Sequence, residues 1–451
     1  MAKMDVSLAR LVAFRCEIHA SFTLRPDALF ELIEALPLMP TISSVVGVSL
    51  SHVFRRCFSS VYDALSNGKV DRAALDKALS AAEPEDAQTI DGYAVYAVDG
   101  TPALRPDAET LPKRSHVYSP AHERGVPGFE YSWLGRVIAE SMSWIATRAV
   151  DRVPAGGSPS KVAADQVRPL ADEATEESPK VVTADSKYAN KFFLAAFVGA
   201  KHLFALVRLS NKRVLYREAE PRGPGEPGGP RKHGAKVRLS QPPEPDHVCT
   251  DTIGRHAVRF CRWTKLHFRD VAALPGVLLR VEFLKPDGSP YYQRPLWLFW
   301  TGPEEVAPQS LLRMYRMRYM IEHFFRFLKQ HLGLLAPRVT SPEGQDNWVW
   351  AVAISFWQLL LARHDVQAVY HPWDPAARRD PARPLTPGQV LAAWGPFLRC
   401  LGTPAAPPGC SGKAPGRAPG FKPQPRERFP ALKKPKRKKA KPAQEKAPLA
   451  A

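Results

Sequence analysis

Cysteine is scarce in this chain, and its arrangement excludes the common cysteine-based sites. Six Cys are spread over 451 residues, and no two of them form a Cys-x-x-Cys pair. Without a secretory context, reduced thiols are the expected state. Cys249, His256, Cys261 and His267 lie near one another in the chain, but their spacing matches no common zinc site. The sequence therefore gives little support to a zinc protein or a disulfide-stabilised domain.

Long hydrophobic runs are also missing. No apolar segment approaches the roughly 20 residues that a helix needs to cross a bilayer. The first residues, Met-Ala-Lys-Met-Asp, have no apolar core behind a charged leader, so we expect no signal peptide and a cytoplasmic location. The hydrophobic fraction of 45% is nevertheless sufficient for a large buried core.

Acidic residues are outnumbered by basic ones, and the formal net charge is +19. Residues 401–451 contain 13 Lys or Arg and two Glu, a net charge of +11, which leaves +8 for the rest of the chain. A basic tail alone often serves only solubility. Because the rest of the chain is also basic, we expect a polyanionic partner.

The first part of the chain has the apolar spacing of amphipathic helices. Helices are predicted at residues 27–36, after Pro26, and at residues 51–65, before the helix-stop signal Asn67-Gly68. Arg and apolar residues alternate in this region. Two interpretations stay open: the helices bind DNA, or they cap the core.

Strand-like and helix-like patterns alternate in the next part of the chain, which predicts a mixed α/β sheet. The predicted strands are 93–99, 115–119, 131–134, 180–185 and 202–209, and the predicted helices are 160–174 and 192–196. Further on we expect a loop at 217–245, strands within 258–281 and 292–300, and helices at 308–334 and 347–363. The Pro-, Gly- and Lys-rich segment beyond residue 401 is expected to be disordered.

Two aspartates occupy the positions where catalytic groups of α/β sheets collect. Asp99 follows Tyr-Ala-Val-Tyr-Ala-Val and precedes a Gly-Thr turn signal, while Asp185 follows Val-Val-Thr-Ala. Strand ends place such side chains at the edge of a crevice. Asp165 and Asp172 are alternatives for the second acid, but they lie in a predicted helix and should be solvated. Asp185 is the better candidate.

A third acid, Glu322, lies in the helix predicted at residues 308–334. At about 100° per residue, one face carries this acid among basic and aromatic residues, and the adjoining face is apolar. The polar face consists of Tyr315, Arg318, Glu322, Arg326 and Lys329. A surface helix with ordinary Arg–Glu pairs would also explain the pattern. A metal-bound phosphodiester explains it equally well, with the carboxylate binding the cation and the bases binding phosphate oxygens.

The spacing Tyr315-x2-Arg318-x3-Glu322-x6-Lys329 is similar to the Y-R-E-K signature of bacterial insertion-sequence DDE transposases. Asp99-Gly-Thr resembles the first-Asp motif of that family, and Ala-Asp185-Ser-Lys-Tyr resembles the second. The resemblance covers about residues 93–363. It implies that Asp99, Asp185 and Glu322 are the catalytic acids and metal ligands. It also implies that Tyr315, Arg318 and Lys329 contact DNA; we add Arg326 from its helical face.

The resemblance implies a ribonuclease-H-like α/β core interrupted by a β-rich insertion. The expected division is a helical, DNA-end-binding region at 1–88, the first part of the catalytic core at 89–210, the insertion at 211–303, the C-terminal core helices at 304–400 and a disordered basic tail at 401–451. In relatives that cut through a DNA hairpin, a Trp of the insertion stacks on a flipped base. Trp263, Trp297 and Trp300 are candidates by residue type, but core packing is the simpler interpretation for each.

The implied activity is cleavage of element ends and their joining to target DNA. Two Mg²⁺ ions, with Mn²⁺ as a substitute, suit phosphodiester chemistry and the oxygen ligands. The implied partners are double-stranded DNA and a second copy of the chain on DNA, and the implied location is the nucleoid. Two alternatives stay open, a transposase-derived DNA-binding protein without activity and a ribonuclease-H-like endonuclease. A glycosidase with paired carboxylates fits the basic charge poorly.

Overall fold

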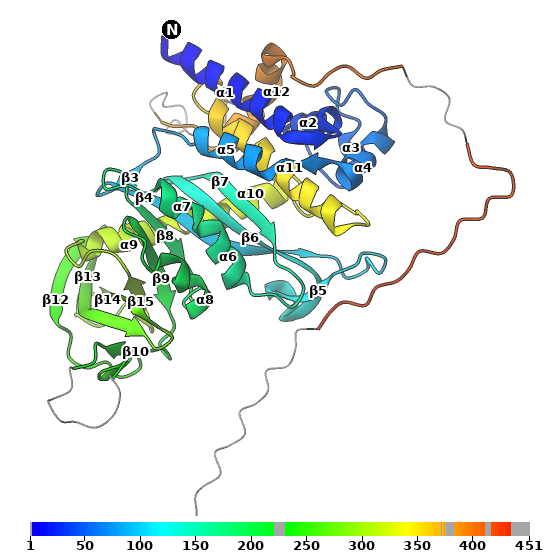
Figure 1. The fold of residues 1–451 in the computed structure, drawn as a ribbon. Helices are drawn as coiled ribbons and strands as arrows, with labels where there is room; N and C mark the ends of the chain where they lie inside the picture. The colour runs from blue at the N-terminus through cyan, green and yellow to red at the C-terminus, as the bar shows by residue number, and fades with distance from the viewer. Residues whose placement is uncertain are drawn as a thin grey trace, which may run out of the picture.

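A computed structural model describes residues 2–220, 231–370, 372–373, 375, 383–410 and 416–433. Its centre is a large mixed sheet with helices on both faces (Figure 1). The helices are α1 (Ala2–Ser21), α2 (Pro26–Ala35), η1 (Leu36–Leu38), α3 (Val45–Val48), α4 (Phe58–Asn67), α5 (Arg72–Ala81), η2 (Pro120–His122), α6 (Pro159–Val167), α7 (Pro169–Glu173), α8 (Lys191–Leu194), η3 (Ala195–Phe197), α9 (Pro308–Met317), α10 (Met320–Gln330), α11 (Pro342–Ala362) and α12 (Pro387–Leu401). No helix among these described residues is long and apolar enough to cross a membrane.

The central strands follow the order β7 (Met142–Arg152), β6 (Arg124–Ala139), β4 (Tyr93–Leu104), β8 (Lys180–Ala184) and β9 (Leu203–Leu209). β4 pairs with β6 in antiparallel fashion, as β6 does with β7. β4 and β8 are parallel, and so are β8 and β9. This mixed order, with helices on both faces, is consistent with a ribonuclease-H-like DDE fold.

Side chains alternate between the two faces of this sheet, as the twofold repeat of a strand requires. On β4, Val95 and Ala97 join a core with α10, α11 and the N-terminal helices. Tyr96 and Val98 join a second core with α6, α7 and α8. The uninterrupted apolar run of β4 therefore reflects burial on both faces, which is typical of a strand with parallel neighbours.

The chain after β9 extends the same sheet. β15 (Leu296–Trp300) pairs with β9 and with β14 (Val271–Leu284), which pairs in turn with β13 (His256–Phe268). The remaining strands are β1 (Phe22–Leu24), β2 (Lys69–Val70), β3 (Thr89–Ile90), β5 (Ser115–Ser119), β10 (Val214–Arg217), β11 (Lys236–Arg238) and β12 (His247–Ile253). The part of the chain expected to be a β-rich insertion therefore contributes antiparallel strands to the main sheet rather than a separate layer.

The three tryptophans considered for base stacking lie in the core. Trp263, Trp297 and Trp300 are at most 2% exposed, and the rings of Trp263 and Trp297 lie 5.6 Å apart. The indole N–H of Trp300 donates to Pro303 O at 2.9 Å. Burying a large apolar side chain contributes about 1.5–3 kcal/mol, so these residues stabilise the sheet. The interpretation of all three as core residues is the correct one.

The helix α11 is buried along nearly its whole length, because α1, α2, α4 and α12 cover it on the side away from β7. Figure 1 shows these helices gathered at one end of the molecule. The first of the two predicted helices, at 27–36, matches α2 closely. The second begins later than predicted, at Phe58 instead of residue 51, but it ends at Asn67 before Gly68 as expected.

Two parts of the segment expected to be disordered make defined contacts. Near its beginning, the Gly402 carbonyl accepts a hydrogen bond from Arg15 at 2.9 Å. Farther along, Leu432 forms a parallel bridge with Ser115 of β5, and its N–H donates to Arg114 O at 2.7 Å. Figure 1 shows the described tail residues along one side of the molecule. The composition gave no sign of these contacts, because backbone groups supply most of them.

Candidate active site

The strand carrying the first aspartate is longer than the sequence predicts. We expected it to end at Asp99, but β4 continues to Leu104 because β6 remains paired with it as far as Gly128. On the other edge of β4, pairing with β8 stops at Val98 and Ala184. Asp99 and Asp185 are the next residues on these two neighbouring strands. They are therefore brought together where the parallel pairing ends.

Asp99 is a largely buried carboxylate, with its side chain 20% exposed. Burial raises its pKa from 3.8 to about 6, and the nearby charge of Asp185 acts in the same direction. The Arg318 guanidinium and the Gly100 N–H, which donates to Oδ1 at 2.7 Å, oppose this rise. Two like charges therefore lie close together at a poorly solvated position, and the cations Arg318 and Lys187 only partly offset the effect on Asp99.

Asp185 is held by the turn that follows its strand. The backbone N–H of Lys187 donates to Asp185 Oδ1 at 2.9 Å, and the Lys187 ammonium forms an ion pair with Glu130 of β6. A Cβ atom added to Gly100 would lie 3.2 Å from Glu130 Oε1, so this carboxylate lies against the backbone beside Asp99. The sequence indicated neither Lys187 nor Glu130. Lys187 is two residues after Asp185, but Glu130 reaches the site only through the β4–β6 pairing.

The structure corrects the prediction of a single helix at residues 308–334, because this segment forms two helices, α9 and α10. α9 ends at Met317 and α10 begins at Met320. At the junction, the N–H groups of Arg318 and Tyr319 donate to carbonyls three residues earlier, as in a 3₁₀ turn. Despite the break, residues 318 and 322 remain about one turn apart, so the Arg–Glu pair of the surface-helix interpretation forms.

Arg318 joins the first and third candidate acids. Its Nη1 donates to Asp99 Oδ2 at 3.1 Å, and its Nη2 donates to Glu322 Oε1 at 2.8 Å. Arg318 is 11% exposed at its side chain, whereas Glu322 is 42% exposed. The guanidinium is therefore enclosed, while the outer carboxylate remains open to solvent.

The other residues of the predicted polar face differ in their surroundings. Tyr315 is buried, which raises its pKa, and Arg318 lies 5.7 Å from its ring centroid. Burial lowers the pKa of Lys329, and the charge of Asp99 partly offsets this effect. Arg326 is exposed on α10. Tyr315, Arg318 and Lys329 thus border the two aspartates, and Arg326 lies on the outer surface.

The three candidate acids do not converge on one point. Among the residues that the structure describes, no group of three or more His, Cys, Asp or Glu side chains has the arrangement of a metal site. Asp99 and Asp185 do fit a hard divalent cation, because both offer oxygen ligands and their neighbouring charges repel. Glu322 is bound to Arg318 instead, so it would have to leave this partner to join a shared ion.

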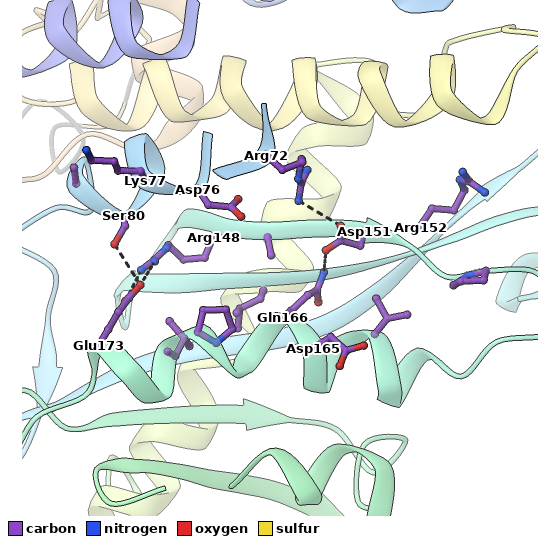
Figure 2. A pocket seen from close by; sticks show the side chains of 17 residues that line it. Arg72, Asp76, Lys77, Ser80, Arg148, Asp151, Arg152, Asp165, Gln166 and Glu173 are labelled. Carbon is purple, nitrogen blue, oxygen red and sulfur yellow. Dashed lines mark hydrogen bonds and ion pairs between the residues drawn. The ribbon is translucent and has the colours of Figure 1, made fainter. Parts of the chain in front are cut away.

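A separate pocket of about 840 Å³ lies between α5, β7 and α6. Figure 2 shows charged side chains along its wall, several of which are paired with one another. Arg148 donates to Glu173, and Arg72 and Gln166 donate to Asp151. Asp165, the alternative to Asp185, lines this pocket, but Asp99, Asp185 and Glu322 do not. Its charges therefore stabilise the packing of the helices around β7.

Comparison with known families bears on the site directly. A family model described as DDE superfamily endonuclease matches residues 17–268, more than half of the chain. The chain belongs to the DDE superfamily endonucleases. No curated protein matches it. The superfamily implies an enzyme that acts on DNA and typically uses divalent metal ions. The matched segment of this DDE endonuclease contains Asp99 and Asp185 and ends before Glu322.

Proposed function

We propose that the protein is a DNA transposase that cuts the ends of a mobile element and joins them to target DNA. The observation that carries this proposal is the buried Asp99 beside Asp185, with Arg318 connecting Asp99 to Glu322. Membership of the DDE superfamily endonucleases supports DNA as the substrate. The Y-R-E-K spacing around Glu322 supports transposition and an insertion-sequence origin.

Asp99, Asp185 and Glu322 are the proposed ligands for two Mg²⁺ or Mn²⁺ ions. Bound ions would stabilise the attacking and leaving oxygens at phosphorus. Asp99 is close to Asp185 and shares Arg318 with Glu322, so it would be the shared ligand. Because Arg318 holds Glu322 at 2.8 Å, DNA phosphate has to replace this carboxylate as the partner of Arg318.

The remaining basic and aromatic groups orient the DNA backbone. Tyr315 and Lys329 border the acids and are proposed to contact phosphates close to the cleaved bond. Arg326 is exposed and would contact a phosphate farther out. Such contacts fix the position of the duplex but carry no sequence information.

Cleavage of labelled terminal-repeat DNA in Mg²⁺ tests the proposal. Asp99→Asn, Asp185→Asn and Glu322→Gln should each lower the cleavage rate by about 100-fold or more, because each removes charge from the reacting centre. Asp287→Asn is the matched control, since Asp287 is an exposed turn residue between β14 and β15 that accepts hydrogen bonds from Ser289 and should leave the rate unchanged. Full activity in any of the first three variants would refute the role of that residue.

An endonuclease without strand transfer is the second candidate. The observation that favours it is the extent of the family match, which stops at residue 268 and leaves Glu322 outside. Both candidates cleave DNA, but only a transposase joins the 3′ ends to a target molecule. A strand-transfer assay separates them, and the mass of the complex with DNA tests the proposed homodimer.

A further inference from the structure

One aromatic side chain near the site faces solvent between two lysines. Phe192 is 43% exposed at the start of α8, although the following Phe193 is fully buried. The ammonium groups of Lys161 and Lys191 lie 5.2 and 5.4 Å from its ring centroid. Within the described residues, neither lysine forms an ion pair with a carboxylate. Contacts of this kind stabilise an exposed ring by only about 0.5–1 kcal/mol.

The cluster borders a groove of about 760 Å³ between α6, α8 and the turn that joins β13 to β14. Its wall combines basic and apolar groups, including Arg168 and Val271. Asp165 and Asp270 are its acidic members, and Asp165 is paired with Arg168. With Lys161, Arg168 and Lys191 against these two acids, the groove keeps a net charge of +1, and both lysines lie beside Phe192, which favours an anionic ligand with a flat apolar part.

Hydrogen bonds connect this groove to the candidate active site. Asn190 Oδ1 accepts from the N–H of Phe192 at 3.0 Å and caps α8. Its Nδ2 donates at 2.8 Å to Ser160 Oγ, next to Lys161, and at 2.8 Å to Lys187 O. The N–H of Lys187 in turn holds Asp185. The backbone of Phe192 is therefore connected through Asn190 to the turn that holds Asp185.

We propose that Phe192, Lys161 and Lys191 form a surface that binds unpaired nucleotides of the DNA strand beside the cleaved bond. The proposal rests on DNA as the substrate of the proposed function. The ring offers a face on which a base stacks, and the lysines contact the flanking phosphates. Bases of an intact duplex are stacked on one another, so the surface selects a melted or single strand. An acidic peptide would supply charge but no base to stack on Phe192.

Binding of a short fluorescein-labelled oligothymidylate tests the proposal by fluorescence anisotropy. All proteins carry Asp99→Asn and are measured without metal, so that binding is separated from cleavage. Phe192→Ala should weaken binding about fivefold or more, and Phe192→Trp should preserve it, because base stacking contributes about 1–3 kcal/mol per base. Joint Lys161→Ala and Lys191→Ala should reduce the salt dependence of log K by about 0.7 per lysine.

Lys201→Ala is the matched control, because Lys201 is exposed near the opposite end of β8 and β9 and should leave binding unchanged. Oligothymidylate binding that is equal in Phe192→Ala and the parent would overturn the proposal. The proposal would also be overturned if Phe192→Ala weakened binding of duplex DNA as much as binding of oligothymidylate, since the ring would then have no preference for unpaired bases. If the protein fails to cleave terminal-repeat DNA while Phe192→Ala still loses oligothymidylate binding, only the proposed function fails.

Discussion

Two of the arginine–carboxylate clusters in this molecule are built differently. In the N-terminal helices, Arg15 and Glu34 form an ion pair in which both side chains are 3% exposed. In the candidate site, Arg318 joins Asp99 and Glu322, which are 20% and 42% exposed. The first cluster is sealed, while the second remains accessible.

The chain itself completes the N-terminal cluster. Thr403 Oγ1 donates to Glu34 Oε2 at 2.9 Å, and Gly402 O accepts from Arg15 at 2.9 Å. In the candidate site, one guanidinium is shared by two carboxylates, and the neighbouring Asp185 adds a further negative charge. The comparison indicates that an enclosed ion pair serves structure, whereas a guanidinium shared by two partly exposed carboxylates can accept a ligand.

The largest effect on stability is expected from Glu34→Ala. It leaves the buried Arg15 without its carboxylate, and breaking such a pair costs about 3–5 kcal/mol of unfolding free energy. Urea unfolding measures this loss. Glu34→Gln, which retains a hydrogen-bond acceptor for Arg15 and Thr403, should lose less. A loss below about 1 kcal/mol in Glu34→Ala would show that the sealed cluster is not a stabilising feature.

Asp99→Asn should have the opposite effect on the free energy of unfolding and stabilise the metal-free protein at about pH 8. Burial raises the pKa of Asp99 from 3.8 to about 6, so its charge destabilises the folded chain above about pH 6. This effect disappears as the pH falls from about 6 to about 4, because folded Asp99 becomes protonated. At about pH 8, the substitution should raise the free energy of unfolding by up to about 3 kcal/mol. Urea unfolding of both proteins at each pH tests it, and a variant less stable than the parent at about pH 8 contradicts it.

In the absence of metal, Arg318→Gln should lower the free energy of unfolding by less than Glu34→Ala does. The change removes the cation between Asp99 and Glu322, and a hydrogen bond to a charged group contributes about 1.5–3 kcal/mol. Mg²⁺ should restore more stability to this variant than to the parent, because a cation can replace the lost charge. Equal effects of Mg²⁺ on the two melting temperatures would argue against an ion beside Asp99.

Local sequence patterns predicted much of the cluster in the candidate site, where Arg318 joins Asp99 and Glu322. The Arg318–Glu322 pair depends only on one turn of helix, and the strand before Asp185 depends only on a short apolar run. The continuation of β4 beyond Asp99 depends on hydrogen bonds to β6, about 30 residues away. In the sequence alone Gly100 looked like a turn residue, because the pairing with β6 cannot be seen there. In the structure it is a paired residue within β4.

Non-local contacts also explain the other differences. The strand β7 was not predicted, since only its pairing with β6 distinguishes its apolar residues from those of a helix. Glu130 joins the site through the same strand β6. The sealed cluster depends on residues 402 and 403, which are almost 370 residues after Glu34. Composition alone predicted disorder there.

The smallest effect is expected from Arg313→Ala, on the same helix α9 that leads to Arg318. Arg313 donates to Glu140 at 2.5 Å, but the two side chains are 47% and 33% exposed. Solvent and salt screen such pairs, which contribute at most about 1 kcal/mol. Urea unfolding should therefore place this variant within about 1 kcal/mol of the parent, with still less difference in high salt. A loss as large as that of Glu34→Ala would show that enclosure does not determine the strength of these pairs, and the contrast between the two clusters would fail.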